Sequence, residues 1–482
     1  MPSFDTVIRN GTVATAGDVV RCDVGIRDGR ITALGEDLTD AEQVIDASGR
    51  LVLPGGIDAH VHIDEPAYMG VKVADDFESG SLAAACGGTT TMISFAAQQR
   101  GKSLRGTVEA YRARAEGKAY IDYAFHLIVS APDEQLLGQE LPALVADGYT
   151  SFKIYMTYEG LALDDRQILD VLAAARRDGA LVMVHAENDH CIHWLKDRYL
   201  AAGDTAVGNH GRIAPMPVER EATHRAIALA EIADVPVLIV HVSGREAVEQ
   251  IEWARRRGLK VYAETCPQYL LLSQDDMDKP GIEGAKYICS PPPRGRDNAE
   301  ALWRALGQGT FQVFSSDHCP YAFDGPGGKQ ARGPKAGFHE IPPGVPGIET
   351  RLALLFSEGV GRGRIALTDF VALSATNAAR LYGLYPRKGT LAVGSDADIA
   401  LWDPERTVTL SHDLLHDRVD YTPYEGRAVT GWPVMTLSRG RVVWDDGAVK
   451  GRPGQGRFLP RERSPLAAPA TRNGDDADPR VG

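Results

Sequence analysis

The sequence is poor in cysteine and in clustered charge of one sign. Its six cysteines are scattered over 482 residues, and no two of them form a Cys-x-x-Cys pair. This spacing argues against a disulfide framework and is expected of a protein kept reduced, so we expect a cytoplasmic location. The formal net charge is −13 at pH 7, and there is no long run of Lys or Arg. A nucleic acid partner is disfavoured, because phosphate binding depends on clustered cations.

Long apolar segments are also missing. No stretch approaches the roughly 18 apolar residues that a membrane-spanning helix needs. The N-terminus reads Met-Pro-Ser-Phe-Asp, without the basic and then apolar pattern of a secretory signal. We therefore expect neither membrane insertion nor secretion.

The pattern of apolar residues and turn residues changes along the chain. Residues 1–53 read as short strands separated by Asn-Gly, Asp-Gly and Ser-Gly turns. Residues 54–388 alternate apolar runs with helical stretches, which is typical of βα units, and strand texture returns over 389–460. We predict an α/β fold with a TIM-type (β/α)8 barrel over 54–388 and a small β-sandwich built from both flanking segments. Residues 461–482 contain little aliphatic side chain and are expected to form a flexible C-terminal tail.

Five apolar runs in the central region each lead to a residue type that binds metal ions. The residues are His60, His62, Lys153, His185, His241 and Asp317. In a βα barrel the carboxyl ends of the strands open into one pocket, so we expect these side chains to meet there. Any one of them alone could be an ordinary core or loop residue, but six such residues in equivalent positions favour a shared metal site.

Lys153 is the unexpected member of this set, because an ammonium group has no lone pair and repels a dication. The carbamate that lysine forms with carbon dioxide, N6-carboxylysine, offers two oxygens and one negative charge. We expect carboxylated Lys153 and a hydroxide to bridge two zinc ions, about 3.5 to 4 Å apart as in other two-metal sites. Since such ions lower the pKa of bound water toward neutrality, the pattern predicts a hydrolase.

Ordered sequence blocks extend this pattern over most of the chain. They include Gly-Gly-Ile-Asp-Ala-His-Val-His (55–62), Ser-Phe-Lys-Ile-Tyr-Met-Thr-Tyr (151–158), Val-His-Ala-Glu-Asn (184–188), Glu-Thr-Cys-Pro-Gln-Tyr-Leu (264–270) and Ser-Asp-His-Cys-Pro (316–320). Together they resemble the cyclic amidohydrolases, most closely the dihydropyrimidinase and D-hydantoinase group. The resemblance implies zinc-dependent hydrolysis of the cyclic amide bond of a small-molecule dihydropyrimidine or hydantoin to an N-carbamoyl amino acid. It also implies a homotetramer, or a dimer.

The resemblance divides the metal ligands into two sets. His60, His62, Lys153 and Asp317 would hold the more buried zinc, whereas Lys153, His185 and His241 would hold the more exposed one. This division agrees with the barrel interpretation, in which all six residues share one pocket.

The resemblance also assigns catalytic and substrate-binding residues. The phenol of Tyr155 would stabilise the oxyanion, and Asp317 would carry a proton from the hydroxide to the departing ring nitrogen. Ser290 and Pro343 would bind the cyclic substrate through backbone groups. Many hydantoinases have Asn where this chain has Pro343, which keeps its carbonyl but has no N–H to donate.

The segment after the His-x-His pair departs from the hydantoinase pattern and leaves alternatives open. Glu65-Pro66 stands where D-hydantoinases usually carry apolar residues, and it resembles allantoinase, so an allantoinase-like hydrolase of another cyclic ureide or imide is one alternative. An unpaired carboxylate there would disfavour a bulky aromatic 5-substituent. Dihydroorotase would want an Arg just after the pair, where this chain has Ile63-Asp64. The alternative from another class is a non-catalytic dihydropyrimidinase-related scaffold protein, although such scaffolds lack the metal ligands that are present here.

Overall fold

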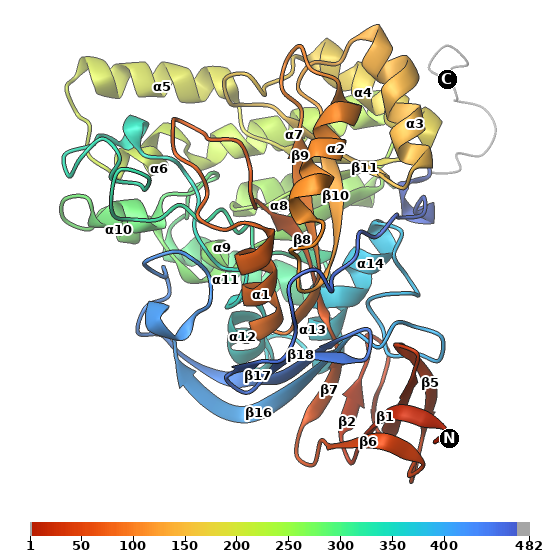
Figure 1. Cartoon of the computed structure of the whole chain (residues 1–482). Coiled ribbons are helices and arrows are strands. Elements are labelled where there is room, and N and C mark those ends of the chain that lie inside the picture. The colour runs from red at the N-terminus through yellow and green to blue at the C-terminus, as the bar shows by residue number, and fades with distance from the viewer. Residues whose placement is uncertain (1, 470–482) are drawn as a thin grey trace.

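A closed ring of parallel strands forms the centre of the molecule, whose computed structural model describes residues 2–469 (Figure 1). Its eight strands, side by side in chain order, are β8 (Gly56–Val61), β9 (Thr89–Ala97), β10 (Asp122–Ile128), β11 (Ser151–Tyr155), β12 (Leu181–His185), β13 (Val237–Ile239), β14 (Val261–Thr265) and β15 (Val313–Phe314). A parallel bridge between Val61 and His318 joins β8 to the segment that follows β15 and closes the ring. The predicted TIM-type barrel is confirmed.

Helices surround the barrel and cover its outer face (Figure 1). The longer ones are α1 (Phe77–Cys86), α2 (Leu104–Ala115), α4 (Asp165–Asp178), α5 (Asp189–Ala201), α7 (Met216–Ala233), α8 (Arg245–Arg256) and α11 (Arg296–Gly307), and shorter ones include α3 (Leu141–Ala146), α12 (Arg351–Leu355), α13 (Leu367–Val371) and α14 (Asn377–Leu381). In α4 the Asp164 side chain caps the N-terminus, Ile168 and Val171 face the core, and Gly179 ends the helix at φ 73°. None of the helices in residues 2–469 has the length and apolar character needed to cross a bilayer.

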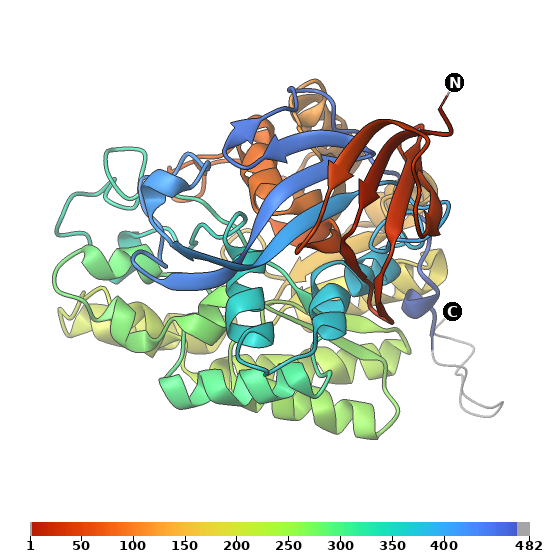
Figure 2. The same cartoon turned by 90° about the horizontal axis from the view of Figure 1, so that it is seen from below.

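Both ends of the chain build a second, all-β unit below the barrel (Figures 1 and 2). One sheet has the order β5 (Arg30–Gly35), β4 (Asp23–Arg27), β1 (Phe4–Arg9), β6 (Ala41–Asp46); the other has the order β19 (Ala448–Val449), β18 (Arg441–Asp445), β17 (Ala428–Ser438), β16 (Ile399–Thr409), β7 (Leu51–Pro54), β2 (Thr12–Ala14), β3 (Val19–Arg21). Because β7 pairs with β16, N-terminal and C-terminal residues share one sheet. This confirms the predicted sandwich, whereas the residue boundaries that we gave for the units remain a proposal.

The described part of the C-terminal segment packs against the barrel. Arg461 is buried, and its Nη1 donates a hydrogen bond to Oγ of Ser151 at 2.8 Å, at the start of β11. Ser464 donates to the carbonyl of Arg380 at 2.6 Å. A buried guanidinium needs hydrogen-bond acceptors, and these contacts hold residues 461–469 against the barrel. The expectation of a flexible tail is therefore wrong for this part of the segment. The remainder of that expected tail, 470–482, lies outside the described residues.

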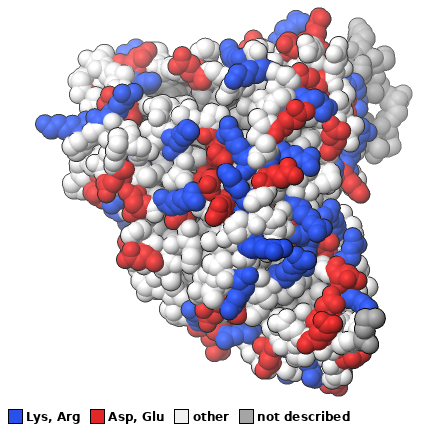
Figure 3. Space-filling model, in the orientation of Figure 1, with Lys and Arg blue, Asp and Glu red and all other residues white. Residues whose placement is uncertain are grey.

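Charged side chains of both signs are interspersed over the face shown in Figure 3. Many of the surface charges form ion pairs; for example, Arg418 Nη1 lies 3.0 Å from Asp76 Oδ2, and Arg176 Nη2 lies 3.1 Å from Asp234 Oδ2. Exposed pairs of this kind contribute little to stability, about 0 to 1 kcal/mol each. The surface charge therefore does not by itself indicate a partner.

Candidate metal centre

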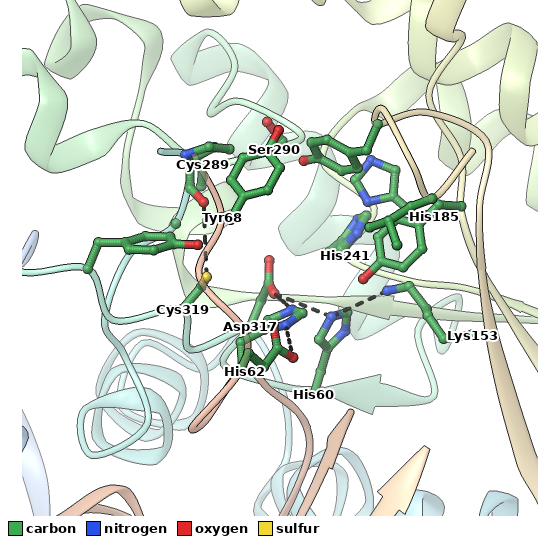
Figure 4. A pocket seen from close by; sticks show the side chains of 17 residues that line it. His60, His62, Tyr68, Lys153, His185, His241, Cys289, Ser290, Asp317 and Cys319 are labelled. Carbon is green, nitrogen blue, oxygen red and sulfur yellow. Dashed lines mark hydrogen bonds and ion pairs between the residues drawn. The ribbon is translucent and has the colours of Figure 1, made fainter. Parts of the chain in front are cut away.

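The candidate ligands meet at the carboxyl ends of the barrel strands (Figure 4). His60 lies in β8, Lys153 in β11 and His185 at the end of β12, whereas His62, His241 and Asp317 lie on the segments that follow β8, β13 and β15. All six residues line one pocket. Two of them, His241 and Asp317, have positive φ angles of 37° and 50°, which residues with a Cβ rarely adopt. Such backbone conformations are concentrated at functional sites.

His60, His62 and Asp317 form the tightest part of this cluster. The Nε2 atoms of both histidines lie 3.3 Å from Oδ1 of Asp317. Their other ring nitrogens face carboxylates: His60 Nδ1 lies 2.6 Å from Glu264 Oε1, and His62 Nδ1 lies 2.9 Å from Glu65 Oε1. If each Nδ1 donates its hydrogen to the carboxylate, the two Nε2 lone pairs point at the Asp317 oxygen. Three donor atoms that converge in this way fit a cation.

The electrostatics of this cluster also call for a positive charge. Although burial lowers the pKa of His62, the carboxylates of Glu65 and Asp317 raise it to about 9. Burial and the nearby Lys153 lower the pKa of His60 well below its usual value. The carboxylates of Glu65 and Asp317 therefore favour a positive charge at this position, as a proton on His62 or as a metal ion in its place.

Lys153 lies beside this cluster without a counter-ion of its own. Its Nζ is 3.4 Å from His60 Nε2 and 5.0 Å from the ring centres of Phe95 and Tyr155. The side chain is completely buried, and within residues 2–469 it forms no ion pair with a carboxylate. Burial lowers its pKa below the usual range. An unpaired buried ammonium is costly, so the site favours a form of this side chain that carries no positive charge.

His185 and His241 lie together on the other side of Lys153. Their ring centres are 4.4 Å apart, and the ring of His241 is 5.4 Å from that of His60. His185 Nε2 lies 2.8 Å from Glu187 Oε2, which leaves Nδ1 as the ring nitrogen available to a ligand. Burial lowers the pKa of His241 well below its usual value, so its imidazole is neutral and can offer a lone pair.

The residues expected to bind substrate line the same pocket. Tyr155 is buried, and its ring stacks on His185 with a centre-to-centre distance of 5.4 Å. Ser290 and Pro343 also line this pocket. The Ser290 hydroxyl, labelled in Figure 4, is 3.2 Å from His210 Nε2.

The sequence did not reveal the three carboxylates that hold the histidine rings. Glu264 is the most connected of them: besides His60 it accepts hydrogen bonds from the His241 backbone N–H at 3.1 Å and from the Ser315 hydroxyl at 2.8 Å. Glu187 and Glu65 hold His185 and His62. The sequence signal that could have identified Glu264 is its position near the end of an apolar strand. The expectation for Glu65 changes, because its carboxylate, which we took as an unpaired barrier to bulky 5-substituents, is paired with His62 Nδ1.

Known proteins share this architecture over almost the entire chain. Residues 51–443 match the profile described as "Amidohydrolase family". The chain is 45% identical to a D-hydantoinase of Ralstonia pickettii, over 95% of this chain and 99% of that protein. The crystal structure of dihydropyrimidinase from Brevibacillus agri NCHU1002 matches with a TM-score of 0.93 and 45% sequence identity. The match covers 95% of this chain and 99% of that one. An L-hydantoinase (dihydropyrimidinase) structure from Arthrobacter aurescens matches at 30% identity, with a TM-score of 0.87 over 95% and 100% of the two chains.

Proposed function

Because this chain belongs to the amidohydrolase family, we propose that it hydrolyses the cyclic amide bond of a dihydropyrimidine or hydantoin and releases an N-carbamoyl amino acid. The observation that carries this proposal is the convergence of four histidines, Lys153 and Asp317 in one pocket at the carboxyl ends of the barrel strands. The relatives named D-hydantoinase and dihydropyrimidinase support this substrate class.

The donor set of the pocket fits two zinc ions. We assign one ion to His60, His62 and Asp317 and the other to His185 and His241, with Lys153 as N6-carboxylysine between them. When bound, such ions polarise a carbonyl and lower the pKa of water. The buried position of Lys153 without a counter-ion supports its carboxylation, because the carbamate replaces an uncompensated cation by a ligand.

Tyr155 and Asp317 carry the roles that the substrate chemistry requires. Burial raises the pKa of Tyr155 well above its usual value, so its hydroxyl stays protonated and can donate a hydrogen bond to the developing oxyanion. Asp317 lies within 3.3 Å of both Nε2 atoms and lines the pocket, where it can pass a proton to the departing ring nitrogen. Pro343 can offer only its carbonyl, which accepts from a ring N–H.

Tyr155→Phe should lower kcat about a hundredfold, because the ring stays while one oxyanion donor is lost. Steady-state rates with dihydrouracil or hydantoin measure this effect. Zinc content, which should equal that of the wild type, serves as the control for an intact site. An unchanged kcat would mean that Tyr155 only packs against His185.

A substrate panel tests the proposed reaction directly. The zinc-loaded protein should open dihydrouracil or hydantoin, followed as loss of amide absorbance, and should turn over allantoin more slowly. Faster turnover of allantoin would favour the second candidate, an allantoinase-like enzyme, to which Glu65-Pro66 is similar. If no cyclic ureide or imide is hydrolysed, the proposed function is wrong. Fewer than one zinc per chain after purification with zinc and bicarbonate would instead favour a non-catalytic scaffold.

We further infer a homo-oligomer, a tetramer or a dimer, in the cytoplasm. The helix α5 has 13 residues but none that is buried, and its Trp194 is 57% exposed. A helix of this length is marginal on its own, so contact with a second copy would stabilise it. Light scattering should give a mass above that of one chain, and a monomer would contradict the assembly.

The proposed cytoplasmic location is supported by the six cysteines, which are free thiols, as expected in a reducing compartment.

A further inference from the structure

A carboxylate next to the His-x-His pair reaches back to one of the candidate ligands. Glu65 Oε1 lies 2.9 Å from His62 Nδ1, and the two side chains are only 18% and 13% exposed. Between them, Asp64 has a φ of 52°, in the left-handed region that residues with a Cβ rarely adopt. This residue turns the chain so that Glu65 faces His62 instead of the solvent.

The turn is fixed by contacts with the helices beside it. The Asp64 backbone N–H donates to the Asp75 carbonyl at 3.0 Å, just before α1 begins. From α2, the hydroxyl of Tyr111 donates to the carbonyl of Ile63, and the guanidinium of Arg114 donates to that of Asp64. The strained backbone is therefore held from two sides, so the position of Glu65 is built into the fold.

The ring of His62 is held equally firmly. Phe95 stacks on it with a centre-to-centre distance of 4.9 Å and an angle of 24° between the ring planes. If the neutral ring donates its Nδ1–H to Glu65, its lone pair lies on Nε2, the atom 3.3 Å from Asp317 Oδ1. A carboxylate in this position fixes the tautomer of a ligating histidine and makes it more basic.

We propose that Glu65 is a positioning residue that orients His62 and tightens the binding of the ion assigned to His60, His62 and Asp317. This inference rests on the proposed function, since it needs that ion. Glu264 and Glu187 face His60 and His185 in the same way, but both are completely buried and their loss would also disturb the core. Glu65 lines the pocket and its side chain is 18% exposed, so its effect on metal binding can be separated from folding.

Zinc competition on the full-length protein tests the proposal without any substrate. Wild type, Glu65→Met, Glu65→Gln and the control Glu159→Gln, a change at an exposed carboxylate on the turn after β11, are loaded with zinc and bicarbonate. Each is then titrated with a zinc chelator of known affinity, and the retained zinc is measured by mass spectrometry. Glu65→Met should release its first zinc at about 10- to 100-fold lower chelator concentration. Glu65→Gln should lie between, because its amide oxygen still accepts the N–H but carries no charge.

Further outcomes decide between this proposal and others. Excess zinc should restore the kcat of Glu65→Met, which a purely structural defect would not allow. Zinc affinity in folded Glu65→Met equal to that of wild type would overturn the proposal, and if this variant fails to fold, wild-type affinity in Glu65→Gln would do the same. A wild-type protein that holds zinc but opens no cyclic amide would overturn only the proposed function. Normal turnover with unchanged zinc affinity in the Glu65 variants would overturn only the role of Glu65.

Discussion

If carboxylated Lys153 bridges two ions as proposed, Lys153→Ala should reduce activity to below about a thousandth of the wild-type rate, because a shared ligand would supply several kcal/mol of metal-dependent stabilisation. Its zinc content should fall as well. The measurements are the initial rate with hydantoin or dihydrouracil and the zinc content of the purified variant. Full activity, or full zinc content, in Lys153→Ala would contradict the bridging role.

Rescue by small molecules makes this prediction specific for the carbamate. Because Lys153 is completely buried, truncation to Ala leaves a cavity beside His60. Acetate or propionate can enter that space and offer two oxygens, so part of the activity should return as the acid concentration rises. Lys329→Met is a matched control, since Lys329 is another buried lysine, but its Nζ donates to the carbonyls of Ala285 and Ile288. Short acids should leave the rate of that control unchanged.

The barrel and its ligand cluster could be predicted from the sequence because both depend on local patterns. A run such as Leu181–His185 is apolar up to its last residue, and parallel strands bring their carboxyl ends together whatever the order of the helices. The position of a ligand at the end of such a run is thus enough to place it in the pocket. No knowledge of long-range contacts is needed for this step.

The carboxylates behind the histidines could not be predicted, because they depend on contacts across the fold. Glu264 meets His60 across 204 positions of the chain, through rotamers that no local pattern specifies. The position of Glu65 depends on the left-handed conformation of Asp64, which no local sequence pattern predicts. For the same reason the sequence showed that both chain ends are rich in strands, but not that β7 lies between β16 and β2.

The role of Lys388 could not be predicted from the sequence either. It is buried, and its Nζ lies 2.7 Å from Asp122 Oδ2, 2.5 Å from Asp398 Oδ2 and 3.0 Å from Asp396 Oδ2. Asp122 begins β10 of the barrel, whereas Asp396 and Asp398 lie just before β16 of the sandwich. The three carboxylates raise the pKa of Lys388 despite its burial, so the ammonium is retained. One cation therefore joins the two units of the molecule.

Lys388→Met should lower the free energy of unfolding by about 3 to 5 kcal/mol, because it removes the cation that all three buried carboxylates share. Asp122 then keeps Arg439 at 3.4 Å and Asp396 keeps Arg387 at 3.1 Å. Urea denaturation followed by circular dichroism measures this loss. Arg220→Met, which breaks the exposed pair with Glu246, should cost less than about 1 kcal/mol and serves as the control. The folded variant should keep its zinc, since Asp122 lies at the amino end of its strand, opposite the metal centre. A loss as small as that of the control would mean that protons or water replace Lys388 at little cost.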